Sequence, residues 1–165
     1  MVERITELKY PLGITRLFFR APIWLYNLHL GWILGNRALK MTHIGRNSGQ
    51  PRHVVLEVVK YEPSSETYYI AAAWGERSDW VKNIRANPKV RIQVARKNFD
   101  VVAEQLTHEE GEEVILDYAH RHPTAMKNLA GFMGFQVDGS ERDFRELGRM
   151  LLLFALKPQH DGNHQ

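Results

Sequence analysis

Short apolar runs of strand length alternate with turn-forming residues along the middle of the chain. Runs rich in valine, isoleucine, tyrosine and phenylalanine are bounded by glycine, proline, serine or asparagine, which is typical of β-strands joined by turns. This pattern predicts five strands, at residues 38–44, 53–61, 67–74, 90–95 and 99–106. The continuous apolar run at 151–156 predicts one more strand, which would suit the centre of a barrel.

Helical segments are predicted on either side of these strands. A short helix at 78–86 should end before Pro88, because the residue that precedes a proline is pushed out of the helical region. Thr107 and Glu110 form a capping box that begins a helix running toward Pro123. Residues 131–135 have the composition of a loop, and a final helix should begin after Ser140 and reach Leu147.

Together these elements predict an α+β fold that is mainly β: a small antiparallel barrel with surrounding helices, one of them inserted between the third and fourth strands. The chain has 165 residues, of which 44% are hydrophobic, so it is long enough for one core. We therefore expect a single domain over residues 1–157, followed by a polar tail at 158–165.

Residues 10–34 carry apolar side chains near helical spacing, interrupted by Arg16 and Arg20. No uninterrupted apolar run approaches the roughly 20 residues that span a bilayer, so we expect an amphipathic helix and no transmembrane helix. One interpretation is a helix that covers the core. The other is peripheral contact with a membrane surface through Trp24 and Trp32.

Charge and composition narrow the classes of ligand. The chain has 22 Lys and Arg against 19 Asp and Glu and no cysteine, which excludes disulfides and thiolate metal sites. An anionic ligand fits the basic residues, but no nucleic-acid recognition motif accompanies them. We expect no metal site, because His120 and His122 lack a third ligand at a convincing spacing. A cytoplasmic location is the simplest expectation.

The turn at 45–52 separates two strands with more residues than a hairpin needs. Gly45 and Gly49 would let backbone N–H groups approach a ligand, while Arg46 and Arg52 supply planar cationic donors for phosphate or carboxylate. The turn is therefore either an anion-binding loop or a solvated hairpin with incidental arginines.

Two motifs in register resemble one known family. Residues 42–52 (THIGRNSGQPR) are similar to the Thr-x-x-Gly-Arg-x-Ser/Thr-Gly-x-Pro-Arg signature of the deazaflavin (F420)-dependent nitroreductase and quinone reductase family, and residues 75–90 are similar to its Asp-Trp-x-x-Asn…Ala-Asn-Pro segment. The resemblance covers residues 39–104. It implies a split β-barrel of the flavin-binding superfamily and binding of reduced coenzyme F420.

The resemblance also implies a set of cofactor contacts. The phosphate and oligoglutamate tail of F420 would be held by Arg46, Asn47, Ser48, Gln50, Pro51 and Arg52, although many relatives carry Lys or Arg in place of Asn47. The flat ring system would lie against Val54, Val55, Leu56, Ala72, Ala73 and Trp74, flanked by Ser78, Trp80 and Asn83. Packing of a helix on the barrel is an equal alternative for Trp80.

The implied reaction is hydride transfer from reduced F420 to a hydrophobic, electron-poor acceptor: a quinone, an enone or a nitroaromatic. Apolar walls for this acceptor are expected from Met126, Leu129, Phe132, Met133 and Phe135. The tyrosines that some relatives place after the proline are missing here, which disfavours bulky nitroimidazoles. No catalytic residue is assigned, and the proton-donor candidates are Tyr118, His120 and His122.

The cofactor, the presence of catalysis and the oligomeric state stay open at this point. The barrel could use FMN in place of F420, or it could carry a flavin, haem or fatty acid without catalysis. Homodimer formation is also open.

Overall fold

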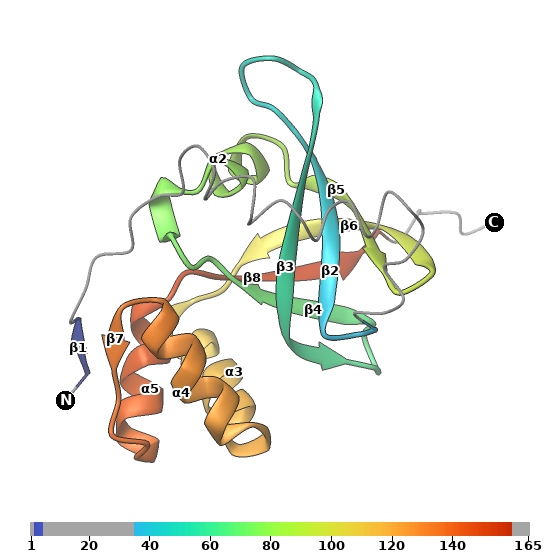
Figure 1. Ribbon diagram of the computed structural model, residues 1–165. Coiled ribbons are helices and arrows are strands. Elements are labelled where there is room, and N and C mark those ends of the chain that lie inside the picture. Colours follow the sequence, from blue (N-terminus) through green and yellow to red (C-terminus); the bar gives the residue numbers. More distant parts are fainter. Residues whose placement is uncertain (1, 5–34, 160–165) are drawn as a thin grey trace.

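The computed structural model describes residues 2–4 and 35–159, so the amphipathic segment predicted at 10–34 lies outside the described residues. Within these residues, six antiparallel strands close a barrel in the order β2-β3-β4-β8-β6-β5 (Figure 1). The strands are β2 (Ala38–Ile44), β3 (Pro51–Glu62), β4 (Thr67–Ala71), β5 (Lys89–Val94), β6 (Lys97–Gln105) and β8 (Leu153–Pro158). The predicted α+β barrel with surrounding helices is confirmed.

The helices lie in two groups around the barrel (Figure 1). The 3-10 helix η2 (Gly75–Arg77) and α2 (Asp79–Ala86) connect β4 to β5, at the end of the barrel where the β2–β3 hairpin turns. The second group consists of α3 (His108–Arg121), α4 (Pro123–Phe132) and α5 (Glu141–Met150). Beside it, the short strands β1 (Glu3–Arg4) and β7 (Phe135–Gln136) pair antiparallel.

Alternation along the strands builds the barrel interior. On β2, Leu39, Met41 and His43 are buried, while the residues between them are only partly buried. Leu39 lies opposite Leu56 and Met41 opposite Val54 in the β2–β3 register, so these side chains share one face. Ile70, Ile92 and Phe154 belong to the same core and are almost fully buried. The barrel therefore has its own apolar core.

A second apolar core lies between the barrel and helices α3 to α5. It contains Val59 and the buried helix residues Ile115, Met126 and Leu147. Helices α3 and α5 approach so closely that a Cβ atom added to Gly148 would lie 2.7 Å from Glu112 Cα and 2.7 Å from the Gly111 carbonyl oxygen. Glycine at position 148 is what permits this approach.

Replacing Gly148 by alanine is therefore expected to lower the free energy of unfolding by about 2 kcal/mol, because overpacking against backbone atoms costs up to roughly 3 kcal/mol and alanine's helix propensity returns about 1 kcal/mol. Urea denaturation measures the change. Gly131 in α4 is a matched control, since an added Cβ meets nothing within 4 Å there. Gly131→Ala should be neutral or stabilising. Equal effects at the two positions would contradict the close approach of α3 and α5.

Several element predictions from the sequence are confirmed. Helix α2 lies between the third and fourth barrel strands, and β8 lies between β4 and β6. The capping box is present: the Glu110 N–H donates to Thr107 Oγ1 (3.2 Å), and the Thr107 N–H donates to Glu110 Oε2 (2.8 Å).

Other boundaries differ from the prediction. Strand β4 ends at Ala71, three residues early, because a turn closed by the Gly75 N–H and the Ala72 carbonyl (3.0 Å) follows it. Strand β8 runs on to Pro158, where the polar tail was expected to begin, and pairs there with β6. The loop predicted at 131–135 is wrong in its first two residues, which complete α4, and in Phe135, which begins β7. Pro123 ends α3 and also begins α4, because proline suits the first helical turn.

Candidate functional site

A cavity of about 880 Å³ lies against strands β3 and β4, between α2 and α4. One part is polar: the β2–β3 turn contributes Gly45, Arg46, Asn47, Ser48 and Arg52. The other part is apolar: its walls come from Val54, Val55, Leu56, Val59, Ala71, Ala73 and Trp74 on and beside the strands, and from Ala125, Leu129 and Phe132 on α4 with Met133 just after it. The cavity is thus cationic at one end and apolar at the other.

The polar end is a compact turn that depends on glycine. The Gly45 N–H donates to the Gln50 carbonyl (2.9 Å), and the Gly49 N–H donates to the Gly45 carbonyl (2.8 Å). Gly49 has a φ of +66°, in the left-handed region, and a Cβ at Gly45 would lie 2.5 Å from Ser48 Oγ. A side chain at Gly45 would therefore press on Ser48, another residue of the cavity wall.

The two arginines of the turn have different surroundings. Arg46 is docked on α2: its Nη1 donates to Asn83 Oδ1 (2.9 Å), and its Nη2 lies 3.4 Å from Asp79 Oδ1. Arg52 lines the cavity, and its guanidinium makes no hydrogen bond or ion pair with another residue of the described part of the chain. Arg52 therefore offers a guanidinium that is available to an anionic ligand.

The apolar end includes aromatic rings from two elements. Trp74 and Phe132 meet edge to face with 6.1 Å between ring centroids, and Phe132 is 44% exposed. Trp80 lines the cavity and also packs its ring edge to face on Phe154, 5.7 Å away, with only 8% of its surface exposed. Trp80 thus packs on the barrel and also forms part of the cavity wall.

Most of the site residues expected from the sequence line this cavity, but five do not. Ala72 faces the barrel core, and Met126 and Phe135 belong to the helix-side core. Gln50 in the hairpin turn and Pro51 at the start of β3 are exposed and lie outside the lining. Sequence reasoning missed other lining residues: His43, His53, Glu57, Val59, Asp79, Ala125 and Asn128. Strand alternation from Val55 could have suggested Glu57.

The three proton-donor candidates differ in how they lie relative to the cavity. Tyr118 is buried in α3, and its hydroxyl donates to Glu57 Oε1 (2.6 Å), a carboxylate that lines the cavity. Burial and this hydrogen bond raise the pKa of Tyr118 above its usual range. His120 lies 3.9 Å from Glu141 Oε2, and His122 precedes α4; neither lines the cavity. Of the three, Tyr118 alone is linked to the cavity wall, through Glu57.

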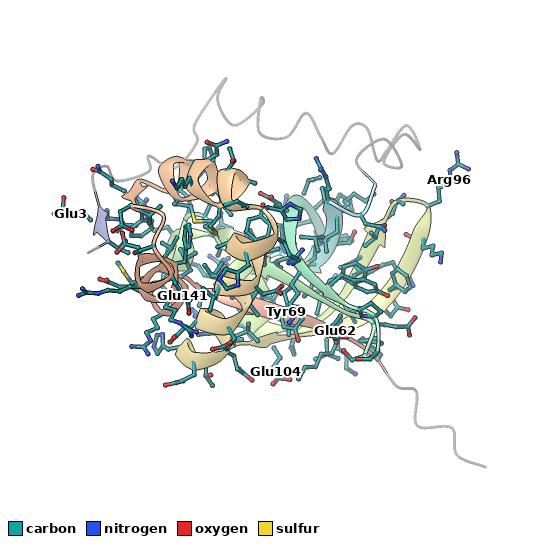
Figure 2. All side chains as sticks on the ribbon, turned by 90° about the horizontal axis from the view of Figure 1, so that it is seen from below. Glu3, Glu62, Tyr69, Arg96, Glu104 and Glu141 are labelled. Atoms are coloured by element: carbon teal, nitrogen blue, oxygen red, sulfur yellow. The ribbon has the colours of Figure 1, made fainter. Side chains whose placement is uncertain are left out.

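The basic residues between positions 77 and 97 do not line the cavity. Arg85 pairs with Glu76, and Arg91 pairs with Asp100 (2.9 Å). Figure 2 shows Arg96 at the tip of the β5–β6 hairpin, pointing away from the barrel. The cationic character of the site therefore comes from the β2–β3 turn.

A family model describes most of this region. The model of the F420H(2)-dependent quinone reductases matches residues 30–128, which contain the turn, the strand walls, α2 and most of α4. The chain belongs to the F420H2-dependent quinone reductase family. It is therefore an oxidoreductase, an F420H2-dependent reductase whose cofactor is coenzyme F420.

Solved structures share the fold of this F420H2-dependent reductase. One is the F420-H2 dependent reductase FDR-A, at 23% identity over 75% of this chain and 96% of that chain, with a TM-score of 0.53. A second, described as a domain-swapped dimer, has 20% identity over 88% and 100%, with a TM-score of 0.51. A third is a conserved hypothetical protein from Mycobacterium tuberculosis, at 14% identity over 82% and 80%, with a TM-score of 0.52.

One buried atom tests whether the cavity fits a polar cofactor such as F420. Ser78 precedes α2 and lines the cavity, yet its Oγ is buried without a hydrogen-bond partner among residues 2–4 and 35–159. A buried hydroxyl without a partner costs about 1–3 kcal/mol, so its place in a cavity wall suits a ligand that supplies the missing bond. Together with the arginine-bearing turn, this atom makes the cavity a good fit for F420.

The remaining expectations concern metals, membranes and assembly. No group of three metal-ligating side chains occurs in the part of the chain that the structure describes. Nor is any helix among the described residues long and apolar enough to cross a membrane. Membrane contact through residues 10–34, homodimer formation and a cytoplasmic location stay predictions from the sequence.

Proposed function

We propose that this F420H2-dependent reductase reduces a flat, hydrophobic quinone in the cavity between β3, α2 and α4. The observation that carries the proposal is the division of one cavity into a cationic end and an apolar end. The cationic end suits the phosphate and oligoglutamate tail of F420, and the apolar end suits its ring system and an acceptor. The volume of about 880 Å³ is within the range of ligand cavities.

The polar residues in this proposal bind and orient the cofactor. The guanidinium of Arg52 and the turn carrying Arg46, Asn47 and Ser48 would hold the anionic tail, because backbone N–H groups and arginine forks suit phosphate and carboxylate. The Ser78 hydroxyl would donate a hydrogen bond to a polar group of the cofactor. Bound F420H2 supplies the hydride, so the chain itself needs to position two flat molecules and exclude water.

The acceptor end favours flat molecules with few hydrogen-bonding groups. Leu129 and Phe132 on α4 and Met133 just after it line the cavity with the strand wall, and none of their side chains carries a hydrogen-bond donor. Methionine adapts its shape, so we expect broad selectivity among quinones, with enones and small nitroaromatics as further acceptors. Bulky nitroimidazoles should be poor substrates, since α4 carries no tyrosine.

Steady-state assays with F420H2 test this proposal. Turnover of a soluble quinone should exceed turnover of a bulky nitroimidazole, measured by the return of the absorbance of oxidised F420. Binding of F420 without turnover of any quinone, enone or nitroaromatic would contradict the reductase proposal and leave a carrier of the deazaflavin in its place.

The variant Phe132→Ala is expected to raise the KM for the quinone by about 10-fold, as removal of an aromatic wall costs roughly 1–2 kcal/mol of binding at a half-exposed site. The Kd for F420 should change less than twofold. Tyr61→Ala is the control, because Tyr61 is 40% exposed but lies outside the cavity. A larger effect of Phe132→Ala on F420 affinity than on KM would place this ring at the cofactor and not at the acceptor.

A further inference from the structure

The Asn83 side chain is a buried amide whose orientation is fixed by its neighbours. Its Oδ1 accepts two hydrogen bonds from Arg46, one from the backbone N–H (3.0 Å) and one from Nη1 (2.9 Å). Both of these groups are obligatory donors, because a backbone N–H and a guanidinium carry no acceptor. The atom facing Arg46 must therefore be the amide oxygen, and the amide nitrogen must face the other way.

The amide nitrogen determines the protonation of His43. Asn83 Nδ2 lies 3.1 Å from His43 Nδ1. Since an amide nitrogen only donates, His43 Nδ1 has to accept, and the ring proton of neutral His43 is placed on Nε2. The opposite tautomer or the imidazolium would point an N–H group at an N–H₂ group. The hydrogen bonds thus run in one direction only, since Asn83 donates to His43 and accepts from Arg46.

The surroundings of His43 favour this neutral ring. His43 is 4% exposed on β2 and lies near His53 and Arg52 of β3 and Asp79 of α2. Burial lowers the pKa of His43 to about 4, with His53 and Arg52 adding to the shift and Asp79 opposing it. His43 therefore accepts from Asn83 throughout the neutral pH range.

We infer that His43 is a positioning residue for cofactor binding: its Nδ1 accepts a hydrogen bond from Asn83 and so helps to hold the amide that binds Arg46 and the β2–β3 turn. This inference rests on the proposed binding of the anionic tail of F420 at that turn. It assigns His43 a role that the family motifs did not suggest, and it makes Asn83 an anchor of Arg46.

A measurement without ligand tests the hydrogen-bond direction. Long-range ¹H–¹⁵N spectra distinguish the histidine tautomers, and comparison with His43→Asn identifies the His43 signals among those of the 8 histidines. We expect neutral His43 with its proton on Nε2 from pH 8 to pH 5. In Asn83→Asp, an acceptor replaces the amide donor, so the proton should move to Nδ1 or the ring should become cationic. A wild-type ring protonated on Nδ1, or cationic at pH 6, would overturn the inference.

A binding series tests the consequence for the cofactor. His43→Leu removes the acceptor, and we expect about 5- to 10-fold weaker F420 binding by fluorescence titration. His43→Asn keeps an acceptor near the position of Nδ1 and should restore affinity to within about threefold of wild type. A deazaflavin riboside without phosphate and tail is the comparison ligand, because its affinity should change little in either variant.

The possible results distinguish a failure of this inference from a failure of the proposed function. Wild-type affinity in His43→Leu would overturn the inference, and equal losses for F420 and the tail-less riboside would show a merely structural role. If His43→Leu does not fold, the other two variants test the inference. His43→Asn should bind F420 nearly as tightly as wild type does, and Asn83→Asp should bind it more weakly. A wild-type protein that does not bind F420 would contradict the proposed function, while the tautomer measurement would still test the hydrogen-bond direction.

Discussion

Arg52→Ala is expected to weaken F420 binding by about 1.5–3 kcal/mol, roughly 10- to 150-fold, while the fold stays intact. Arg52 lines the cationic end of the cavity, and its guanidinium forms no hydrogen bond or ion pair with any other residue in 2–4 and 35–159. If the turn holds the anionic tail as proposed, the loss of this guanidinium would remove charge-assisted hydrogen bonds to the ligand without breaking a hydrogen bond or ion pair of the described residues. Fluorescence titration measures the change, and thermal denaturation checks the fold.

Arg91→Ala is the matched control for Arg52→Ala. It removes the same charge from β5, where Arg91 pairs with Asp100 outside the cavity. Wild-type F420 binding should fall as salt rises, and the salt dependence should be weaker in Arg52→Ala than in Arg91→Ala. An unchanged affinity in Arg52→Ala with a normal melting temperature would mean that the turn is only a hairpin.

Phe154→Ala should have the largest effect on stability, a loss of about 3–5 kcal/mol in the free energy of unfolding. Phe154 is 2% exposed on β8 inside the barrel, and its ring supports Trp80 of α2. Truncation would leave a cavity beneath a helix that carries part of the functional site. Since domains are stable by only about 5–15 kcal/mol, the variant should unfold at far lower urea concentration than wild type.

Two further variants serve as comparisons for the loss of stability expected in Phe154→Ala. Phe154→Leu keeps most of the volume and should cost less than about 1.5 kcal/mol. Met150→Ala truncates a side chain that is 52% exposed and should stay within about 0.5 kcal/mol of wild type. A loss of less than 1 kcal/mol in Phe154→Ala would contradict the packed barrel interior.

The strands could be predicted from the sequence because their signal is local. β-branched and aromatic residues between turn formers mark β2 to β6, and Thr107 with Glu110 marks the start of α3. Helix α4 was harder to predict, because a proline such as Pro123 can either end a helix or begin one. In addition, Gly131 weakens the helical pattern of this segment. The sequence therefore indicated Leu129 and Phe132 as acceptor-wall residues without indicating the helix that positions them.

The site was predictable only as far as its motif is contiguous. The turn at 45–52 gave Arg46 and Arg52 directly, but the contacts of Asn83 with Arg46 and His43 join residues 37 and 40 positions apart. A local sequence pattern does not predict contacts between residues so far apart in the chain. Similarly, the sequence could not tell that Ala73 lines the cavity while its neighbour Ala72 faces the barrel core, because that depends on how the chain turns after β4.

The most direct test is a fluorescence titration of the wild-type protein with F420, FMN and the tail-less deazaflavin riboside under one set of conditions. The proposal that the β2–β3 turn holds the anionic tail predicts that F420 binds most tightly and that its advantage over the riboside shrinks as salt rises. FMN binding as tightly as F420, or a riboside affinity equal to that of F420 at low salt, would contradict it.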